Sequence, residues 1–216
     1  MFLSNGELYL VASGTHVPEA FPLFARLVGL AWPGSAEPVD LTIMDFSHAI
    51  PHYRALTGPT TYELHVPSEH LAAFTAELKP LLSNRSGIDD GAGGEWIHVH
   101  NTESTALDIL AALPSVPVEV ATVDLAPEPF DWELVPPHPA RASVRTGVHW
   151  PAFGDVGPHG KHAAVCLFTN NRNLWDLDPG DPGYGLYVAT ERNGLPRATH
   201  LAAAAGLTVL NGPFPD

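Results

Sequence analysis

The chain contains little cysteine, and it lacks any long apolar run. Its single cysteine, Cys166, has no partner for an internal disulfide, which is typical of proteins kept in a reducing compartment. No uninterrupted apolar stretch approaches the roughly 18 residues that a membrane-spanning helix needs. Residues 1–7 lack the basic and apolar regions of a signal peptide. These features predict a cytoplasmic protein with no membrane partner.

Basic residues are also scarce. Ten of them stand against twenty-four acids, giving a formal charge of −14. Such a surface repels phosphate backbones and anionic lipids, which excludes nucleic acids and membrane surfaces as partners bound by bulk electrostatics. It favours a partner of positive charge, such as a basic protein, a cationic small molecule or a metal ion. A high net charge also serves solubility alone, and that interpretation stands beside the first.

Several common catalytic and nucleotide-binding motifs are absent. The sequence has no phosphate-binding loop ending in Lys-Ser or Lys-Thr, no Gly-x-Gly-x-x-Gly, no Gly-x-Ser-x-Gly and no His-Glu-x-x-His. Hydrophobic residues nevertheless make up 45% of the chain, which is enough for a sizeable core. The sequence therefore predicts a folded protein and leaves open whether it is an enzyme.

The first part of the chain alternates between strand and helix patterns. Strands are predicted at 7–12, 39–44, 61–66 and 95–100, and helices at 18–28 and from Ser68 onward, with a flexible glycine-rich loop at 83–94. This β-α-β-β-α-β order is that of ferredoxin-like folds. We therefore expect an α+β protein with a ferredoxin-like first half.

A proline-rich passage, 126–139, separates this part from a mixed, strand-rich second half. Strands are predicted there at 142–150, 162–169, 184–190 and 207–210, and a helix at 197–205. We expect a ferredoxin-like domain at 1–125 and a strand-rich α+β region at 126–216. That region either folds separately or packs on the first as one unit.

Alternation along the predicted strands brings several polar and aromatic residues to one surface. His98 and His100 lie on the same side of their strand as Trp96, and Glu63 and His65 lie on the polar side of theirs. If the four strands form one sheet, its helix-free face carries six such residues. They are Tyr9, Glu63, His65, Trp96, His98 and His100.

Two functions fit this face. The first is a non-catalytic binding or accessory protein, in which Tyr9, Glu63 and Trp96 contact a basic protein, as in immunity or antitoxin proteins. The second half of the chain or a second copy, making a homodimer, are other ways to cover the same surface. The alternative is a small metal-dependent hydrolase, with His65, His98 and His100 binding a divalent transition metal and Glu63 acting as the acid-base group.

Three other groups have simpler structural explanations. Asp45, His48 and His52 follow a predicted strand, and capping or exposure to solvent accounts for them. Cys166 follows His159 and His162 but lies in an apolar strand, where a cysteine is usually inert. The acidic run at 176–183 lacks the spacing of a calcium loop and has the composition of turns.

Overall fold

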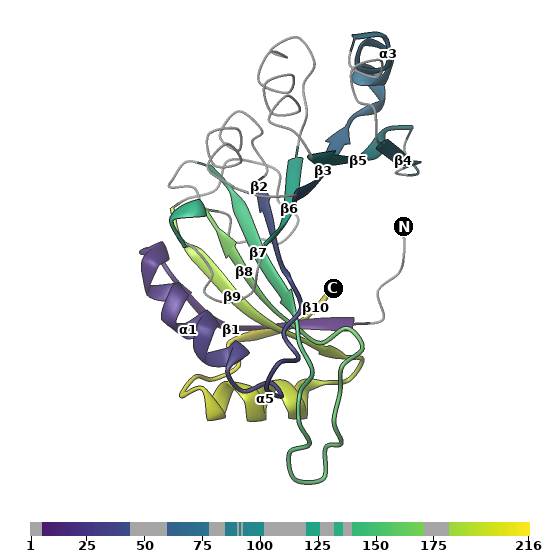
Figure 1. The fold of residues 1–216 in the computed structure, drawn as a ribbon. Coiled ribbons are helices and arrows are strands. Elements are labelled where there is room, and N and C mark those ends of the chain that lie inside the picture. Colours follow the sequence, from purple (N-terminus) through teal and green to yellow (C-terminus); the bar gives the residue numbers. More distant parts are fainter. Residues whose placement is uncertain are drawn as a thin grey trace. The chain divides into compact units, whose positions relative to one another are not determined.

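The computed structural model describes residues 6–43, 60–77, 85–89, 91, 93–101, 120–125, 132–135, 140–170 and 182–216. These residues form helices and antiparallel strands, so the protein is of the α+β class, as predicted (Figure 1). The strands are β1 (Gly6–Gly14), β2 (Val39–Ile43), β3 (Thr60–Val66), β4 (Arg85–Asp89), β5 (Glu95–Asn101), β6 (Val120–Leu125), β7 (Ala142–Gly147), β8 (Ala164–Thr169), β9 (Tyr184–Glu191) and β10 (Asn211–Pro215). The helices are α1 (Ala20–Val28), α3 (Ser68–Glu77) and α5 (Leu195–Ala204), with single 3₁₀ turns η1 (Val17–Glu19) and η2 (Trp132–Leu134).

The chain folds into two compact units, which we describe separately. The central unit is Leu41–Leu125, and the terminal unit combines Phe2–Asp40 with Ala126–Asp216. The units do not follow the expected division into 1–125 and 126–216, because Phe2–Asp40 groups with Ala126–Asp216. Independent folding of residues 126–216 stays a prediction.

The terminal unit contains five strands in the order β10-β1-β9-β8-β7, and each neighbouring pair is antiparallel. Strand β9 is buried along its whole length except at Glu191, and β8 is buried except at Phe168. Their sequences are almost continuously apolar because both faces of these strands are covered. They form the centre of this unit's core.

Helices α1 and α5 pack on these strands, α1 against β1, β8 and β9 and α5 against β1 and β9 (Figure 1). Apolar residues in α1 recur at helical spacing, so that Ala20, Phe24 and Leu27 form one buried stripe. The guanidinium group of Arg26 donates a 2.8 Å hydrogen bond to the carbonyl of Ala205, just beyond α5. This bond ties the two helices together and satisfies a carbonyl at a helix end.

The central unit contains β6, β3, β5 and β4 as antiparallel neighbours in that order. Helix α3 begins at Ser68, where the sequence predicts a helix start, and contacts β3. Within the described residues, no helix is both long enough and apolar enough to cross a bilayer.

The ferredoxin-like order predicted for the first half is not confirmed, because β1 is hydrogen-bonded to β9 and β10 in the terminal unit. Both faces of β1 carry apolar residues. Leu8 and Tyr9 are adjacent and so point to opposite faces, and both are buried, as is Val11. Such a strand needs neighbours and cover on both sides, and local periodicity does not reveal which strands supply them.

Two local predictions were wrong. The loop expected over 83–94 contains β4, a short strand that pairs with β5. The last strand is Asn211–Pro215 and not 207–210. Its two prolines argued against a strand, but β10 lies at the edge of the terminal unit's strand order, where a residue without a backbone N–H is tolerated.

Candidate functional site

The register between β3 and β5 determines how the predicted site residues pair. Glu63 lies opposite His98, and His65 lies opposite Trp96. Opposed residues of an antiparallel pair have Cα atoms about 4.5–5.5 Å apart and belong to the same face of the sheet. The backbone therefore brings these four positions together, as the period-two argument required.

His100 pairs with Thr61 at the next same-face position of this ladder. Strand β4 lies on the other side of β5, with Ser86 opposite His98. The side chains of His98, His100, Glu63 and Trp96 lie outside the described part of the structure. Among the side chains that are described, no group of three or more His, Cys, Asp or Glu residues could hold a metal ion. The metal site stays a prediction.

Tyr9 belongs to the terminal unit, in β1. Its side chain is 1% exposed, and its hydroxyl donates a 2.6 Å hydrogen bond to Glu7 Oε2. Burial, followed by the hydrogen bond and charge of Glu7, raises the pKa of the Tyr9 hydroxyl above its usual value. The hydroxyl is thus used within the unit, and the binding role predicted for Tyr9 stays a prediction without support from these contacts.

The other sequence candidates have no catalytic arrangement in the described structure. Asp45, His48 and His52 lie outside the described residues, as does the acidic run at 176–181. Cys166 is a free, buried cysteine, and burial raises the pKa of its thiol to about 12. It is therefore a neutral core residue at physiological pH, as its apolar surroundings predicted.

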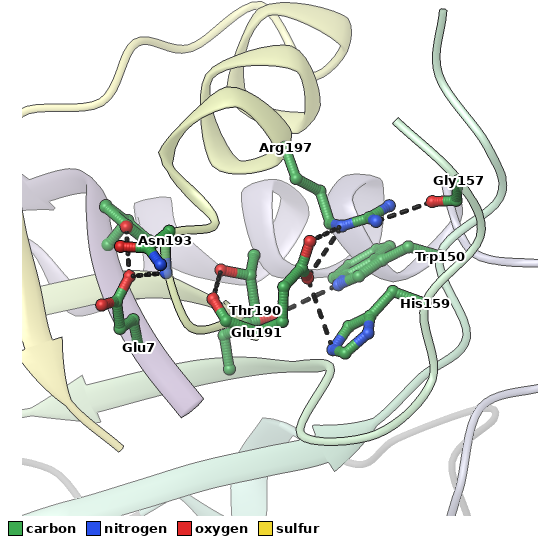
Figure 2. A network of polar contacts seen from close by, with 10 residues as sticks. Glu7, Trp150, Gly157, His159, Thr190, Glu191, Asn193 and Arg197 are labelled. Carbon is green, nitrogen blue, oxygen red and sulfur yellow. Dashed lines mark hydrogen bonds and ion pairs between the residues drawn. The ribbon is translucent and has the colours of Figure 1, made fainter. Parts of the chain in front are cut away.

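A polar network that the sequence did not reveal lies where β9 leads into α5 (Figure 2). Arg197, in the first turn of α5, is only 3% exposed. Its Nε donates to both carboxylate oxygens of Glu191, at 3.1 and 3.0 Å, and its Nη2 donates to the carbonyl of Gly157 at 2.6 Å. One guanidinium group therefore joins the end of β9, α5 and a third segment of the chain.

That third segment is a hairpin, residues 150–159. Trp150 and His159 exchange both backbone hydrogen bonds at its base, at 2.7 and 3.0 Å, and Phe153 and Val156 do so at its tip, at 2.8 and 2.9 Å. The buried Trp150 indole donates a 3.2 Å bond to the carbonyl of Ala189 in β9. The hairpin is thus attached to β9 at its base and to α5 through Arg197.

His159 completes the network, with its Nε2 3.4 Å from Glu191 Oε2 (Figure 2). Burial lowers the pKa of His159 below its ordinary value; the positive charges of Arg197 and His162 act in the same direction, while Glu191 opposes them. Burial also opposes ionisation of Glu191, but the hydrogen bond from Arg197 prevails and holds the pKa of Glu191 below its usual value. The described pair is therefore a neutral imidazole beside a carboxylate.

The described contacts of this network join three segments of the terminal unit. Although His159 Nε2 is 3.4 Å from Glu191, it makes no hydrogen bond to any described residue. Arg197 Nη1 is also buried and makes no hydrogen bond to a described residue. Arg197 binds a neighbouring carbonyl and not an open surface. We conclude that the network holds the hairpin in place.

The preceding turn is fixed in a similar way. Glu7 Oε2 accepts a 2.9 Å hydrogen bond from the backbone N–H of Asn193, whose φ is +61°. Gly194 follows, and a Cβ at this position would collide with Thr190 Oγ1. The link from β9 to α5 is therefore rigid from Glu191 to Arg197.

No protein-family model, curated protein or solved structure matches this chain. Any functional assignment therefore depends on the residues themselves.

Proposed function

We propose that this protein is a non-catalytic binding protein whose acidic surface holds a basic protein partner, in the manner of immunity or antitoxin proteins. The observation that carries the proposal is the formal charge of −14. The buried free thiol of Cys166 supports a reducing, cytoplasmic location as part of the same proposal.

The use of the described arginines supports this proposal. Arg145 makes two hydrogen bonds to Asp216, at 2.5 and 2.9 Å, and Arg197 is buried against Glu191. Each pair contains one acid and one base, so forming these pairs does not change the net negative charge of the protein. They also withdraw two of only eight arginines from contact with a partner.

The described surface is acidic as well. Of the described charged side chains that are exposed, five are acids and three are bases. The acids are Glu19, Glu37, Glu69, Glu133 and Asp155, and the bases are Arg26, Lys161 and Arg192. A surface of this kind attracts cationic partners at long range and accelerates their association.

Titration with an arginine-rich peptide and with an aspartate-rich peptide of equal length tests the proposal. We expect saturable binding of the basic peptide that weakens steeply between about 0.05 and 0.5 M salt, because screening shortens the reach of exposed charges. The acidic peptide should not bind. Absence of binding by the basic peptide at low salt, or binding indifferent to salt, would count against the proposal.

A metal-dependent hydrolase is the second candidate, favoured by the β3–β5 register. This register puts Glu63 opposite His98 and leaves His65 one diagonal step from His98. Diagonal neighbours are about 7–8 Å apart at Cα, within reach of two imidazoles sharing one metal ion. In this proposal His65, His98 and His100 are the candidate ligands, with His98 as the one that the register brings near each of the other two, and Glu63 activates a metal-bound water.

Metal analysis of untagged protein tests this second candidate. We expect about one equivalent of zinc or a related divalent metal, lost in the H98A/H100A double variant but retained in H149A. His149 is an exposed histidine of the terminal unit and controls for general loss of imidazole. Metal-free protein of unchanged stability would remove this candidate and leave the first unaffected.

A further inference from the structure

The segment between α1 and β2 carries an exposed tryptophan. Among the described residues, three large hydrophobic side chains are exposed: Trp32 at 49%, Leu195 at 50% and Leu210 at 54%. Tryptophan is the one of these residue types that is enriched at the energetic centres of interfaces. Of the three, Trp32 is therefore the side chain best suited to an interface contact.

The backbone around Trp32 is held in place. The Trp32 N–H donates a 3.0 Å bond to the carbonyl of His149, and the Trp32 carbonyl accepts a 3.0 Å bond from the N–H of Ser35. The Ser35 hydroxyl in turn accepts a 3.2 Å bond from the N–H of His149. Because this backbone is already ordered, the protein loses little backbone conformational entropy when a ligand stacks on the indole.

An exposed acid, Glu37, follows Trp32 on the same segment and is anchored by its backbone to the same neighbouring stretch of chain. The N–H of Glu37 donates a 2.8 Å bond to the carbonyl of Gly147, two residues before His149. Two residues of extended chain span about 7 Å. A Cβ on Gly147 would collide with the Glu37 carboxylate, so the carboxylate lies directly over this glycine. Glu37 is itself exposed.

We propose that Trp32 and Glu37 form the docking point for an arginine side chain of the basic partner. This inference rests on the proposed function and adds the place and the chemistry of recognition. A planar guanidinium stacks on an indole face and at the same time donates to a carboxylate, whereas the compact ammonium group of lysine does this less well. The backbone anchors of the two residues, His149 and Gly147, are about 7 Å apart along the chain, so Trp32 and Glu37 are held on one short segment.

The position of the contact can be observed directly by NMR. Each of the five tryptophans gives one indole N–H signal, and the signal missing from the W32F spectrum identifies Trp32. On titration with a hexa-arginine peptide above about pH 7.5, where histidines are mostly neutral, we expect the Trp32 signal to shift most. Hexa-lysine should shift it less. A titration in which other indoles move and Trp32 does not would overturn the docking point.

Affinity measurements use controls matched in exposure and in charge. We expect W32A to weaken hexa-arginine binding about two- to fivefold, the range for an exposed cation–π contact. L195A removes an apolar side chain of equal exposure and should change nothing. E37Q and E19Q each remove one exposed negative charge, and E37Q alone should weaken binding clearly. Equal effects of E37Q and E19Q would indicate bulk charge and reject the docking point.

These experiments also separate the two proposals. Wild-type protein that binds no basic peptide contradicts both the proposed function and the docking point. Salt-sensitive binding that W32A and E37Q leave unchanged contradicts the docking point alone. Thermal unfolding of each variant checks that its fold is intact, which is expected because the bonds that hold the Trp32 segment are made by its backbone and by Ser35.

Discussion

Removing Glu191 should destabilise the protein more than removing Arg197, although Arg197 is the more deeply buried partner. The Arg197 side chain is 4% exposed and that of Glu191 is 35% exposed. Breaking a buried pair is costly mainly because of the charge that is left behind without a partner. Water can reach a remaining Glu191 carboxylate, but it reaches a remaining Arg197 guanidinium poorly.

The expected magnitudes follow from what each variant leaves. In E191A the guanidinium keeps only the Gly157 carbonyl as a partner. Loss of one partner of a buried pair costs about 3–5 kcal/mol, and partial access of water at position 191 favours the lower end, about 3 kcal/mol. In R197M the apolar stem remains, Glu191 is hydrated, and the lost bond to Gly157 costs about 1 kcal/mol.

Equilibrium urea unfolding of E191A, R197M and the double variant measures these differences. Once Arg197 is gone, no unpaired buried charge remains at this site, so the double variant should be close to R197M, well below the sum of the single effects. R192M removes an exposed arginine of the same turn and should change stability by less than about 0.5 kcal/mol. The reasoning is refuted if R197M costs as much as E191A, or if the two effects are additive.

Three further predictions concern the same unit. The pKa of His159 is lower in the folded than in the unfolded protein, so its contribution to stability is fully present above the unfolded pKa of about 6.5 and is lost as pH falls below that value. H159Q should therefore flatten the pH–stability curve below about pH 6.5. An unchanged slope would contradict this role of His159. G194A should cost about 1–3 kcal/mol in urea unfolding because its Cβ meets Thr190, whereas G157A, with open space around it, should be nearly neutral; equal effects would be evidence against the tight turn. Cys166 should react with a thiol reagent only on unfolding, since it is buried and the pKa of its thiol is about 12, and rapid labelling of native protein would disprove this.

Periodicity predicted most of the described elements because it records which side of each element is buried. Helix α1 and the start of α3 at Ser68 both lie where the sequence pattern predicts helices, although the buried stripe of α1 is Ala20, Phe24 and Leu27 and not the predicted Phe21, Phe24, Ala25 and Val28. Strand β10 was missed because a period-two search discounts a segment with two prolines. Its pairing with β1 depends on an edge position that only the assembled strands create.

Strand partners were harder to predict than strands. Burial of both faces of β1 is visible in its sequence. Its neighbours β9 and β10, however, lie about 180 and about 200 residues away along the chain and carry no local signal. For the same reason, the cross-strand pairing of Glu63 with His98 could be anticipated only as far as β3 and β5 were assumed to be adjacent. The alternation of residues along a strand predicts which of them point to the same face. Which strands are neighbours, and so which residues of different strands share a face, is decided by the tertiary structure.

The network around Arg197 was not predictable from residue types alone. An arginine in the first turn of a helix normally suggests a solvated position. The only local sign of burial is that Arg197 precedes the buried Leu201 by four residues, which places both on one face of α5. Its partner Gly157 is far away in the sequence and contributes a backbone carbonyl, which no motif encodes. The sequence contained the charges of this site but not their distances.

Net charge and local geometry answer different questions about binding. The acidic surplus acts over about a Debye length, so it draws any cation toward any part of this surface and is weakened by salt everywhere. A stacked and paired guanidinium is a short-range contact, less affected by salt once it is formed. An acidic surface that serves solubility alone therefore loses all binding as salt rises, whereas a docking point at Trp32 leaves a residual affinity at high salt that depends on one indole and one carboxylate. The difference between wild type and W32A at high salt is where the two explanations separate.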